Sequence, residues 1–283
     1  MSARSIITAR QERLGTELRK LRERAGLTGR EAARDMGFAE TRISAVESAR
    51  VGVSGERVRY LAGQYACDDT ALVDALAAMA DERVRGWWEA YRHTLPPTFL
   101  DLAELEHHAA YVRSFENVQV PGLLQTESQV RAIYTSSTTR LSPEQMDARV
   151  EFRLRRQKVL GSGEPFRFAV VIHEAALRVR VADRAVARRQ LLHIAEQSER
   201  PQVVVRVVPF DVDGFTDIGN ALLIAGGQVP KLDTVLVDTA HGGAFVDAEA
   251  QLSRYRRVLD NVESAAMGVV ESRDFIVRLA KSI

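Results

Sequence analysis

The chain has 283 residues, 46% of them hydrophobic and 27% charged, which excludes a largely disordered protein and predicts about two globular domains. The formal net charge of +1 hides an asymmetry. Residues 1–65 carry 13 basic and 8 acidic side chains, a net charge of +5, whereas the remainder carries 26 and 30, a net charge of −4. This distribution is typical of a nucleic-acid-binding domain joined to a body that does not bind nucleic acid.

Cysteine content and hydropathy exclude further classes of protein. Cys67 is the only cysteine, so an intramolecular disulfide framework and a cysteine-rich zinc site are excluded, and a reducing cytoplasm is indicated. No apolar run approaches the roughly 18 residues of a membrane span, and residues 1–4 do not lead into the apolar core of a signal peptide. We therefore expect a cytoplasmic protein without membrane contact.

Residues 1–12 are expected to form an N-terminal arm, and residues 13–83 a bundle of five short helices. The first helix has leucines at spacings of four and three, which make one helical face. Thr28 and Glu31 have the spacing of a capping box and predict the start of the second helix. Further helices are expected at residues 39–48, after the cap Ser54, and at 69–83.

The second and third helices are expected to be joined by a turn at Gly37, to which a positive φ is available without strain. Two short helices around a glycine turn are typical of a helix-turn-helix motif. Glu47, at the end of the third helix, is placed to reach Arg22 on the first. The segment resembles DNA-binding domains of the Xre/Cro type. The resemblance is carried by Leu18-Arg19, Leu21-Arg22, Gly26-Leu27-Thr28, Glu31, Ala33, Gly37, Ile43-Ser44 and Glu47.

This resemblance implies that residues 39–48 are the recognition helix, whose N-terminal part enters the major groove. Arg42 would bind either a guanine edge or a phosphate, and Glu40 would accept from a cytosine amino group. Phosphate contacts are expected from Arg30, Arg50 and the first amides of the second helix. The expected DNA-binding residues are Thr28, Arg30, Glu40, Thr41, Arg42, Ser44 and Arg50, and the structural residues are Arg22, Gly37 and Glu47.

Three residues depart from the Xre/Cro pattern. Gly29 stands where a polar DNA-contacting side chain is usual, and Ala39 replaces the usual Ser or Thr cap, a loss of about 1 kcal/mol. Ala49 replaces the glycine that commonly follows the third helix. These departures favour weaker DNA binding and leave open a helical bundle that is used for protein contacts.

The fold class is predicted to be multidomain, with an all-α helix-turn-helix bundle, a helical segment and a mixed-sheet α/β domain. Residues 84–283 form the body, helical over 84–160 and α/β over 161–283. Two-residue periodicity predicts strands at 168–173, 203–209, 221–225 and 234–238. A helix at 184–197 makes the first two strands a candidate parallel pair. Helices at 249–262 and 272–280 end the body.

The body also carries a set of motifs that resembles one family. They are Gly86-Trp87-Trp88 with Tyr91, Phe115-Glu116, Val120-Pro121-Gly122-Leu123-Leu124-Gln125-Thr126, Arg149, Arg153, Arg156-Gln157, Glu174-Ala175-Ala176-Leu177, Glu199-Arg200-Pro201, Val203, Val207 and Pro209-Phe210. With these motifs, residues 13–280 resemble the WhiJ-like bacterial regulators, which are antitoxin-like. The resemblance implies an Xre-type head joined to a large domain without an assigned activity, often encoded beside a small partner protein.

Motifs for catalysis, metal binding and cofactor binding are incomplete. His173-Glu174 begins a zinc-protease motif, but Leu177 stands where its second histidine belongs. His107 and His108 are expected to point to different faces of a helix and not to share a metal. There is no nucleophile elbow or phosphate-binding loop. We expect no catalytic residue, no metal and no cofactor.

The favoured hypothesis is a homodimeric, sequence-specific transcriptional regulator that binds an inverted-repeat operator in double-stranded DNA. Its body would dimerise, through residues 87–91 or the helix after Ser272, and receive a small-molecule signal or a small partner protein. One alternative is an antitoxin-like interaction protein that mainly binds such a partner. Another is an enzyme with an appended DNA-binding head, which a polar pocket with perturbed titratable groups at the carboxyl ends of the body's strands would favour.

Overall fold

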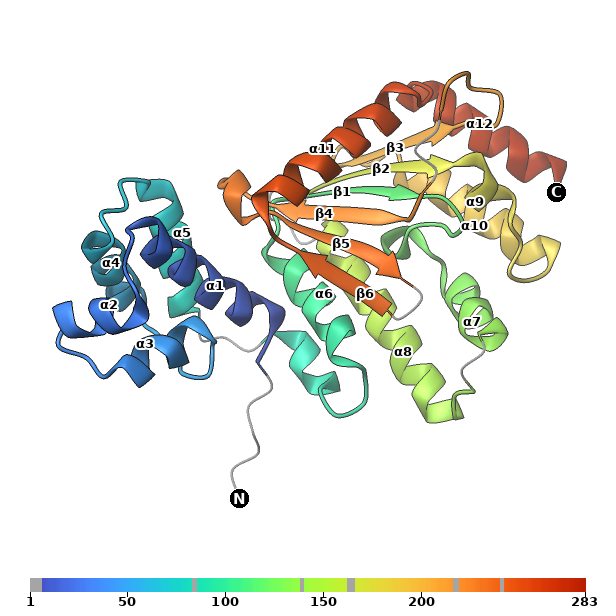
Figure 1. Cartoon of the computed structure of the whole chain (residues 1–283). Helices are drawn as coiled ribbons and strands as arrows, with labels where there is room; N and C mark the ends of the chain where they lie inside the picture. The colour runs from blue at the N-terminus through green and yellow to red at the C-terminus, as the bar shows by residue number, and fades with distance from the viewer. Residues whose placement is uncertain (1–6, 83–85, 138–139, 162–165, 216–218, 240–241) are drawn as a thin grey trace. The chain divides into compact units, whose positions relative to one another are not determined.

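The computed structural model describes residues 7–82, 86–137, 140–161, 166–215, 219–239 and 242–283 (Figure 1). The chain divides into two compact units, Met1–Trp87 and Trp88–Ile283. The boundary predicted between residues 83 and 84 falls on 83–85, outside the described residues. Each unit has its own buried apolar side chains, and the predicted order of an all-α head followed by an α/β body is confirmed.

Over residues 7–82, the N-terminal unit consists of the five helices that the apolar spacing predicted. Leu18, Ile43 and Leu76 come from the first, third and fifth of them and are buried, and the first helix contacts both of the others. The helices are α1 (Ala9–Arg24), α2 (Gly29–Asp35), α3 (Glu40–Glu47), α4 (Gly55–Gln64) and α5 (Thr70–Asp81).

The predicted arm of residues 1–12 is wrong in its second half, because α1 begins at Ala9. Thr8 caps this helix. Its hydroxyl accepts from the Gln11 amide at 3.3 Å, and the Gln11 side chain accepts from the Thr8 amide at 3.1 Å. A capping box of this kind satisfies two amides that a helix start leaves unpaired. Residues 1–6 of the arm lie outside the described residues.

The body is built on a six-stranded mixed sheet with the order β3-β2-β1-β4-β5-β6. Strands β1, β2 and β3 are parallel, and β4, β5 and β6 continue the sheet antiparallel. The parallel pair predicted around the helix α10 (Arg184–Gln197) is confirmed. The strands are β1 (Tyr111–Glu116), β2 (Arg167–His173), β3 (Val203–Val208), β4 (Leu222–Gly226), β5 (Thr234–Thr239) and β6 (Gly242–Val246).

The expectation of helix throughout residues 84–160 is wrong at β1. This strand is central and pairs with β2 on one side and β4 on the other. Val112 and Phe115 are fully buried on opposite faces of the sheet, in two separate apolar clusters. Its partners lie far along the chain, so tertiary pairing decides its conformation over local periodicity. The edge strand β6 was also missed, since it opens with Gly242 and Gly243.

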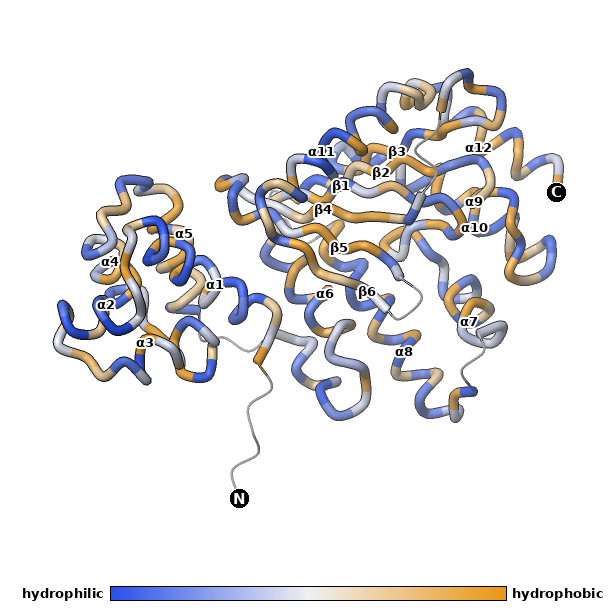
Figure 2. Tube along the Cα trace, in the orientation of Figure 1, coloured by the Kyte–Doolittle hydropathy of each residue, from blue (hydrophilic) through white to orange (hydrophobic). Residues whose placement is uncertain are grey.

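Helices cover both faces of the sheet (Figure 1). Helix α11 buries Leu252, Leu259 and Val262 on one face. On the other face lie α6, α8 and α10, and the strands between are the most hydrophobic stretch of the body (Figure 2). The remaining bounds are η1 (Trp87–Tyr91), α6 (Pro97–His108), η2 (Gly122–Leu124), α7 (Glu127–Ser136), α8 (Pro143–Arg156), η3 (Gln157–Gly161), α9 (Glu174–Arg178), η4 (Pro230–Leu232), α11 (Glu249–Ser264) and α12 (Val269–Ser282).

The two surfaces expected to form a dimer contact are largely internal to the body. Trp88 packs on His107 with ring centroids 5.1 Å apart, and Tyr91 packs on Phe152 at the same distance. On α12, Ile276 is fully buried in the sheet core. The apolar side chains that suggested these surfaces are therefore used in folding the body.

Candidate nucleic-acid interface

Helix α3 has few stabilising features within its own sequence. It is eight residues long, and its cap position, Ala39, makes no side-chain hydrogen bond. Ile43 is its one buried residue. Gly37 precedes it with φ +65°, the left-handed conformation that the predicted turn requires. The position of α3 therefore depends on contacts with its neighbours.

The most specific of these contacts is an ion pair between α1 and α3. Arg22 donates from Nε to one oxygen of Glu47 at 2.6 Å and from Nη2 to the other at 2.9 Å. It also donates from Nη1 to the Leu27 carbonyl at 2.6 Å. The side chains are 9% and 11% exposed. The hydrogen bonding that Arg22 donates to Glu47 raises the pKa of Arg22, and burial raises the pKa of the neighbouring Tyr65 to about 12.

Helices α1 and α3 also touch through their backbones. A Cβ atom at Gly15 of α1 would lie 2.5 Å from the carbonyl oxygen of Glu47. Real Cβ atoms do not approach a backbone oxygen that closely, so the crossing of the two helices requires glycine at this position.

The predicted contact residues of α3 lie on its exposed side. Glu40, Thr41, Arg42 and Ser44 are all exposed, as is Arg30 on α2. Arg50, just past the helix, donates to the Ser48 hydroxyl at 2.8 Å and to the Ser44 hydroxyl at 3.4 Å. The structure therefore brings Ser44 and Arg50 together at one end of the exposed side.

The expected phosphate contact at the start of α2 is disfavoured by a carboxylate already there. The Thr28 hydroxyl accepts from the Glu31 amide at 3.2 Å and donates to the Glu31 carboxylate at 2.7 Å. That carboxylate also accepts from the Thr28 amide at 2.8 Å, and these bonds lower the pKa of Glu31. A second anion at this helix end would be repelled by the first.

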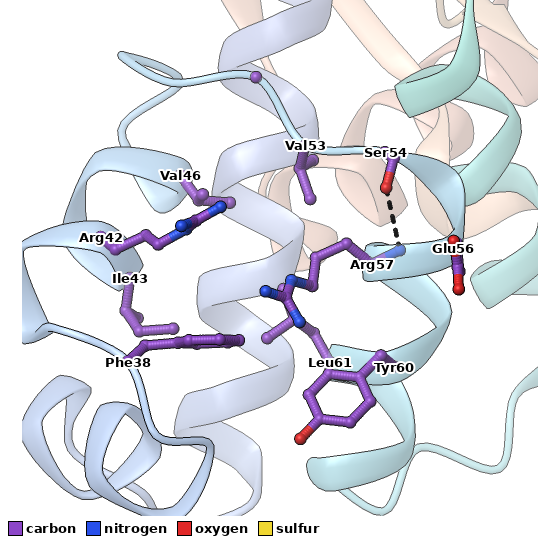
Figure 3. A pocket seen from close by; sticks show the side chains of 11 residues that line it. Phe38, Arg42, Ile43, Val46, Val53, Ser54, Glu56, Arg57, Tyr60 and Leu61 are labelled. Carbon is purple, nitrogen blue, oxygen red and sulfur yellow. Dashed lines mark hydrogen bonds between the residues drawn. The ribbon is translucent and has the colours of Figure 1, made fainter.

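A groove that the sequence analysis missed lies between α3 and α4 (Figure 3). It has a volume of about 410 Å³, with Arg42 on the α3 side and Arg57 and Tyr60 on the α4 side. The guanidinium carbon of Arg57 lies 4.1 Å from the ring centroid of Phe38, and that of Arg42 lies 5.7 Å from it. Arg57 and Tyr60 are three residues apart, so their common helix face could have been predicted.

Ala49, which replaces the usual glycine, has φ +54°. An alanine in this conformation is strained by about 1–2 kcal/mol, so Ala49→Gly is expected to raise the melting temperature by a few degrees. The matched control Ala45→Gly, inside α3, should lower it, because glycine costs about 1 kcal/mol in a helix interior. Thermal unfolding followed by circular dichroism measures both. A lower melting temperature for Ala49→Gly would contradict the claim that Ala49 is strained.

The residues of the incomplete catalytic and metal motifs make structural contacts within the body. The His173 Nδ1 accepts from the Ala175 amide at 3.2 Å, and Glu174 accepts from the Phe210 amide at 2.9 Å. The prediction that His107 and His108 point apart is wrong. Their ring centroids lie 4.9 Å apart, and both pack on Trp88, because α6 ends at His108.

Two protein families match the sequence. Residues 13–83 match a family described as a helix-turn-helix domain. Residues 99–278 match a family described as a domain of unknown function (DUF5753). No curated protein and no solved structure matches the chain. Among the described residues, no helix has both the length and the apolar character to cross a membrane.

Proposed function

The chain belongs to the DUF5753 family and carries a helix-turn-helix domain ahead of it, and from this premise we propose that it is a dimeric, sequence-specific, cytoplasmic regulator of transcription. One observation carries the proposal. The exposed side of α3 is held by the buried pair of Arg22 and Glu47, with Arg42, Arg50 and Arg57 around it. A fixed helix face ringed by guanidinium groups suits a major groove lined by phosphates.

Arg42 and Arg57 are assigned different roles. Arg42 projects from α3 and would read a base edge, whereas Arg57 projects from α4 and would hold a phosphate. Arg42→Ala is expected to weaken binding to the operator by about 1–3 kcal/mol and binding to random DNA much less. Arg57→Ala should weaken both alike and reduce the salt dependence by about one ion. Fluorescence anisotropy on an operator selected from random DNA by the full chain measures both effects.

A matched control is Arg59→Ala. Arg59 is exposed on α4, two residues from Arg57 and so on another face, and it pairs with Asp74 at 3.2 Å. Its loss should leave DNA binding unchanged. Equal losses for Arg42→Ala on operator and random DNA would make Arg42 a phosphate contact, and no loss on either would remove it from the interface.

The dimer rests on the size of the head. One helix-turn-helix domain reads about one half-site, which is too little for a unique genomic address. Two heads related by a two-fold axis would enter successive major grooves about 34 Å apart. Because the aromatic cluster at Trp88 is buried, and so is Ile276 on α12, we place the dimer contact on the exposed side of α12, with Val270, 71% exposed, as the first position to test.

This arrangement predicts an inverted-repeat operator. Its half-sites should be centred about 10 base pairs apart, or a multiple of that. Sedimentation of the 31.5 kDa chain with its operator should give two chains per duplex. Val270→Glu should lower the dimer fraction without lowering the melting temperature. One chain bound to an asymmetric site would refute both the dimer and the repeat.

Each of the two alternatives has an observation in its favour. The uncapped Ala39 favours an antitoxin-like protein whose main role is to bind a small partner protein. In the body, Glu116 and Asp238 lie at the carboxyl ends of β1 and β5, beside a cavity, which favours an enzyme. We propose that the body binds a signal and catalyses no reaction. In support, the described residues that line this cavity include no histidine, cysteine or lysine, and the Ser114 hydroxyl makes no hydrogen bond to a base in the described structure.

A further inference from the structure

The body contains a cavity of about 560 Å³, within the range of small-molecule sites. It lies between one face of the sheet, at β1, β4 and β5, and helices α6 and α8. Residues 116–123, 125 and 219–223 form further parts of its wall. Apolar side chains from four of these elements line it, namely Phe99, Leu102, Phe152, Leu223 and Leu236.

Two carboxyl groups line one side of the cavity. In the sheet register, Phe115, Leu222 and Val237 form one row, and Glu116 and Asp238 belong to the next. They are separated by one strand, so their Cα atoms are about 10 Å apart, close enough for one small group to lie between the carboxyls. Neither side chain makes a hydrogen bond or ion pair in the described part of the chain.

On the helix side, α8 supplies two guanidinium groups with different partners. Arg156 is satisfied, because it donates to both oxygens of Glu106, at 2.8 and 2.6 Å. Arg153 donates to the neutral Gln125 side chain at 2.7 Å and lies 5.0 Å from the Tyr134 ring centroid. Within the described ranges Arg153 has no carboxylate partner, and desolvation lowers its pKa.

A buried hydroxyl gives independent support for a ligand. Ser114 lies two residues before Glu116 on β1, so both face the cavity. Its side chain belongs to a residue only 2% exposed, and its Oγ has no hydrogen-bond partner in the described structure. Since buried polar groups are nearly always hydrogen-bonded, this hydroxyl marks where a polar group of a ligand would bind.

We propose that this cavity binds a small organic zwitterion with apolar substituents. Its anionic group would pair with Arg153, and its ammonium group would lie between Glu116 and Asp238. The substituents would pack on Phe99 and Phe152. This inference deepens the proposed function and rests on it where it takes the ligand to be the signal that the body receives.

The charges around Glu116 give the proposal a pH dependence. Desolvation and the nearby Asp238 raise the pKa of Glu116 to about 8. Arg153 and Arg156 oppose this shift, and Arg156 is itself paired with Glu106. Desolvation also raises the pKa of Asp238. An ammonium group favours the ionised carboxyl, so binding at pH 7 should release most of one proton. Affinity should increase from pH 6 to 8 and fall above it, as the ligand's own amine, of pKa about 8, loses its proton.

The test uses the full chain and leucyl-phenylalanine, a zwitterionic dipeptide with two apolar side chains. N-acetyl-leucyl-phenylalanine keeps only the anion, and leucyl-phenylalanine amide keeps only the cation. Isothermal titration calorimetry in two buffers of different ionisation enthalpy measures affinity and proton release together. The dipeptide should bind at least tenfold more tightly than either analogue.

Substitutions separate the two subsites. Arg153→Gln should weaken the dipeptide and the acetylated analogue alike, whereas Glu116→Gln should weaken the dipeptide and abolish proton release. Arg131→Gln and Asp147→Asn, which alter an exposed ion pair 2.8 Å long on α7 and α8, are the matched controls and should change nothing. Equal binding of all three compounds, no binding of any, or hydrolysis of the dipeptide would overturn the inference.

Failure of this site is distinguishable from failure of the proposed function. Calorimetry requires no DNA, so the dipeptide would bind even if the head bound no operator. If the chain binds both the dipeptide and the operator, a saturating concentration of dipeptide should change the operator affinity at least fivefold. An unchanged operator affinity would overturn the assignment of the ligand as the signal.

Discussion

Glu47→Ala is expected to destabilise the N-terminal unit by about 3–5 kcal/mol, because it leaves the Arg22 guanidinium buried without its carboxylate. The pair is 9% and 11% exposed, and Glu47 accepts two of the three hydrogen bonds that Arg22 donates. Since α3 has no side-chain cap, its position should be lost together with the stability. The free energy of unfolding, measured in urea, and the operator affinity should therefore decrease together.

Two further variants decide how the pair acts. Asp74→Ala breaks an exposed pair with Arg59, whose side chains are 69% and 53% exposed, and should cost less than about 1 kcal/mol. The double variant Arg22→Met/Glu47→Leu removes both charges and should recover much of the loss. Full stability of Glu47→Ala with lost DNA binding would instead make Glu47 a direct DNA contact.

Gly15→Ala is expected to destabilise the same unit by about 1–3 kcal/mol and to displace α3. The added Cβ would meet the Glu47 carbonyl oxygen at 2.5 Å, and backbone atoms cannot move aside as a flexible side chain can. The helix propensity of alanine offsets about 1 kcal/mol of this cost. Operator affinity should fall together with the melting temperature.

The matched control for Gly15 is Gly63→Ala on α4. Gly63 is exposed, and a Cβ atom there meets nothing within 4 Å. This variant should gain about 1 kcal/mol from helix propensity and leave DNA binding unchanged. If Gly15→Ala were as stable as Gly63→Ala, the close crossing of α1 and α3 would be refuted.

The features that could be predicted from the sequence depend on short-range spacing or on a recognisable motif. The capping box of Thr28 and Glu31, the glycine turn at Gly37 and the pairing of Arg22 with Glu47 follow from spacing and from resemblance to one motif. The same spacing at Thr8 and Gln11 would have given the true start of α1. Local signals of this kind depend on residues within one or two turns of each other.

The features that were missed depend on residues distant in the chain. Strand β1 is stable because β2 and β4 flank it, and its own six residues do not determine that. The groove beside α3 forms only when Arg57 meets Phe38. The cavity of the body places Glu116, Arg153 and Asp238 together from three elements, and the raised pKa of Glu116 depends on that assembly. Such an assembly of side chains from distant elements corresponds to no sequence motif, so it could not be predicted.

The central claim, sequence-specific DNA binding by the helix-turn-helix head, is tested most directly by one titration. The full chain is titrated onto its selected operator and onto a shuffled duplex of equal length, at salt concentrations from 50 to 200 mM, with fluorescence anisotropy as the signal. The operator should bind at least about 10³-fold more tightly than the shuffled duplex, and the logarithm of both affinities should fall linearly with the logarithm of salt concentration. Equal affinity for the two duplexes, or binding that does not depend on salt, would contradict the account.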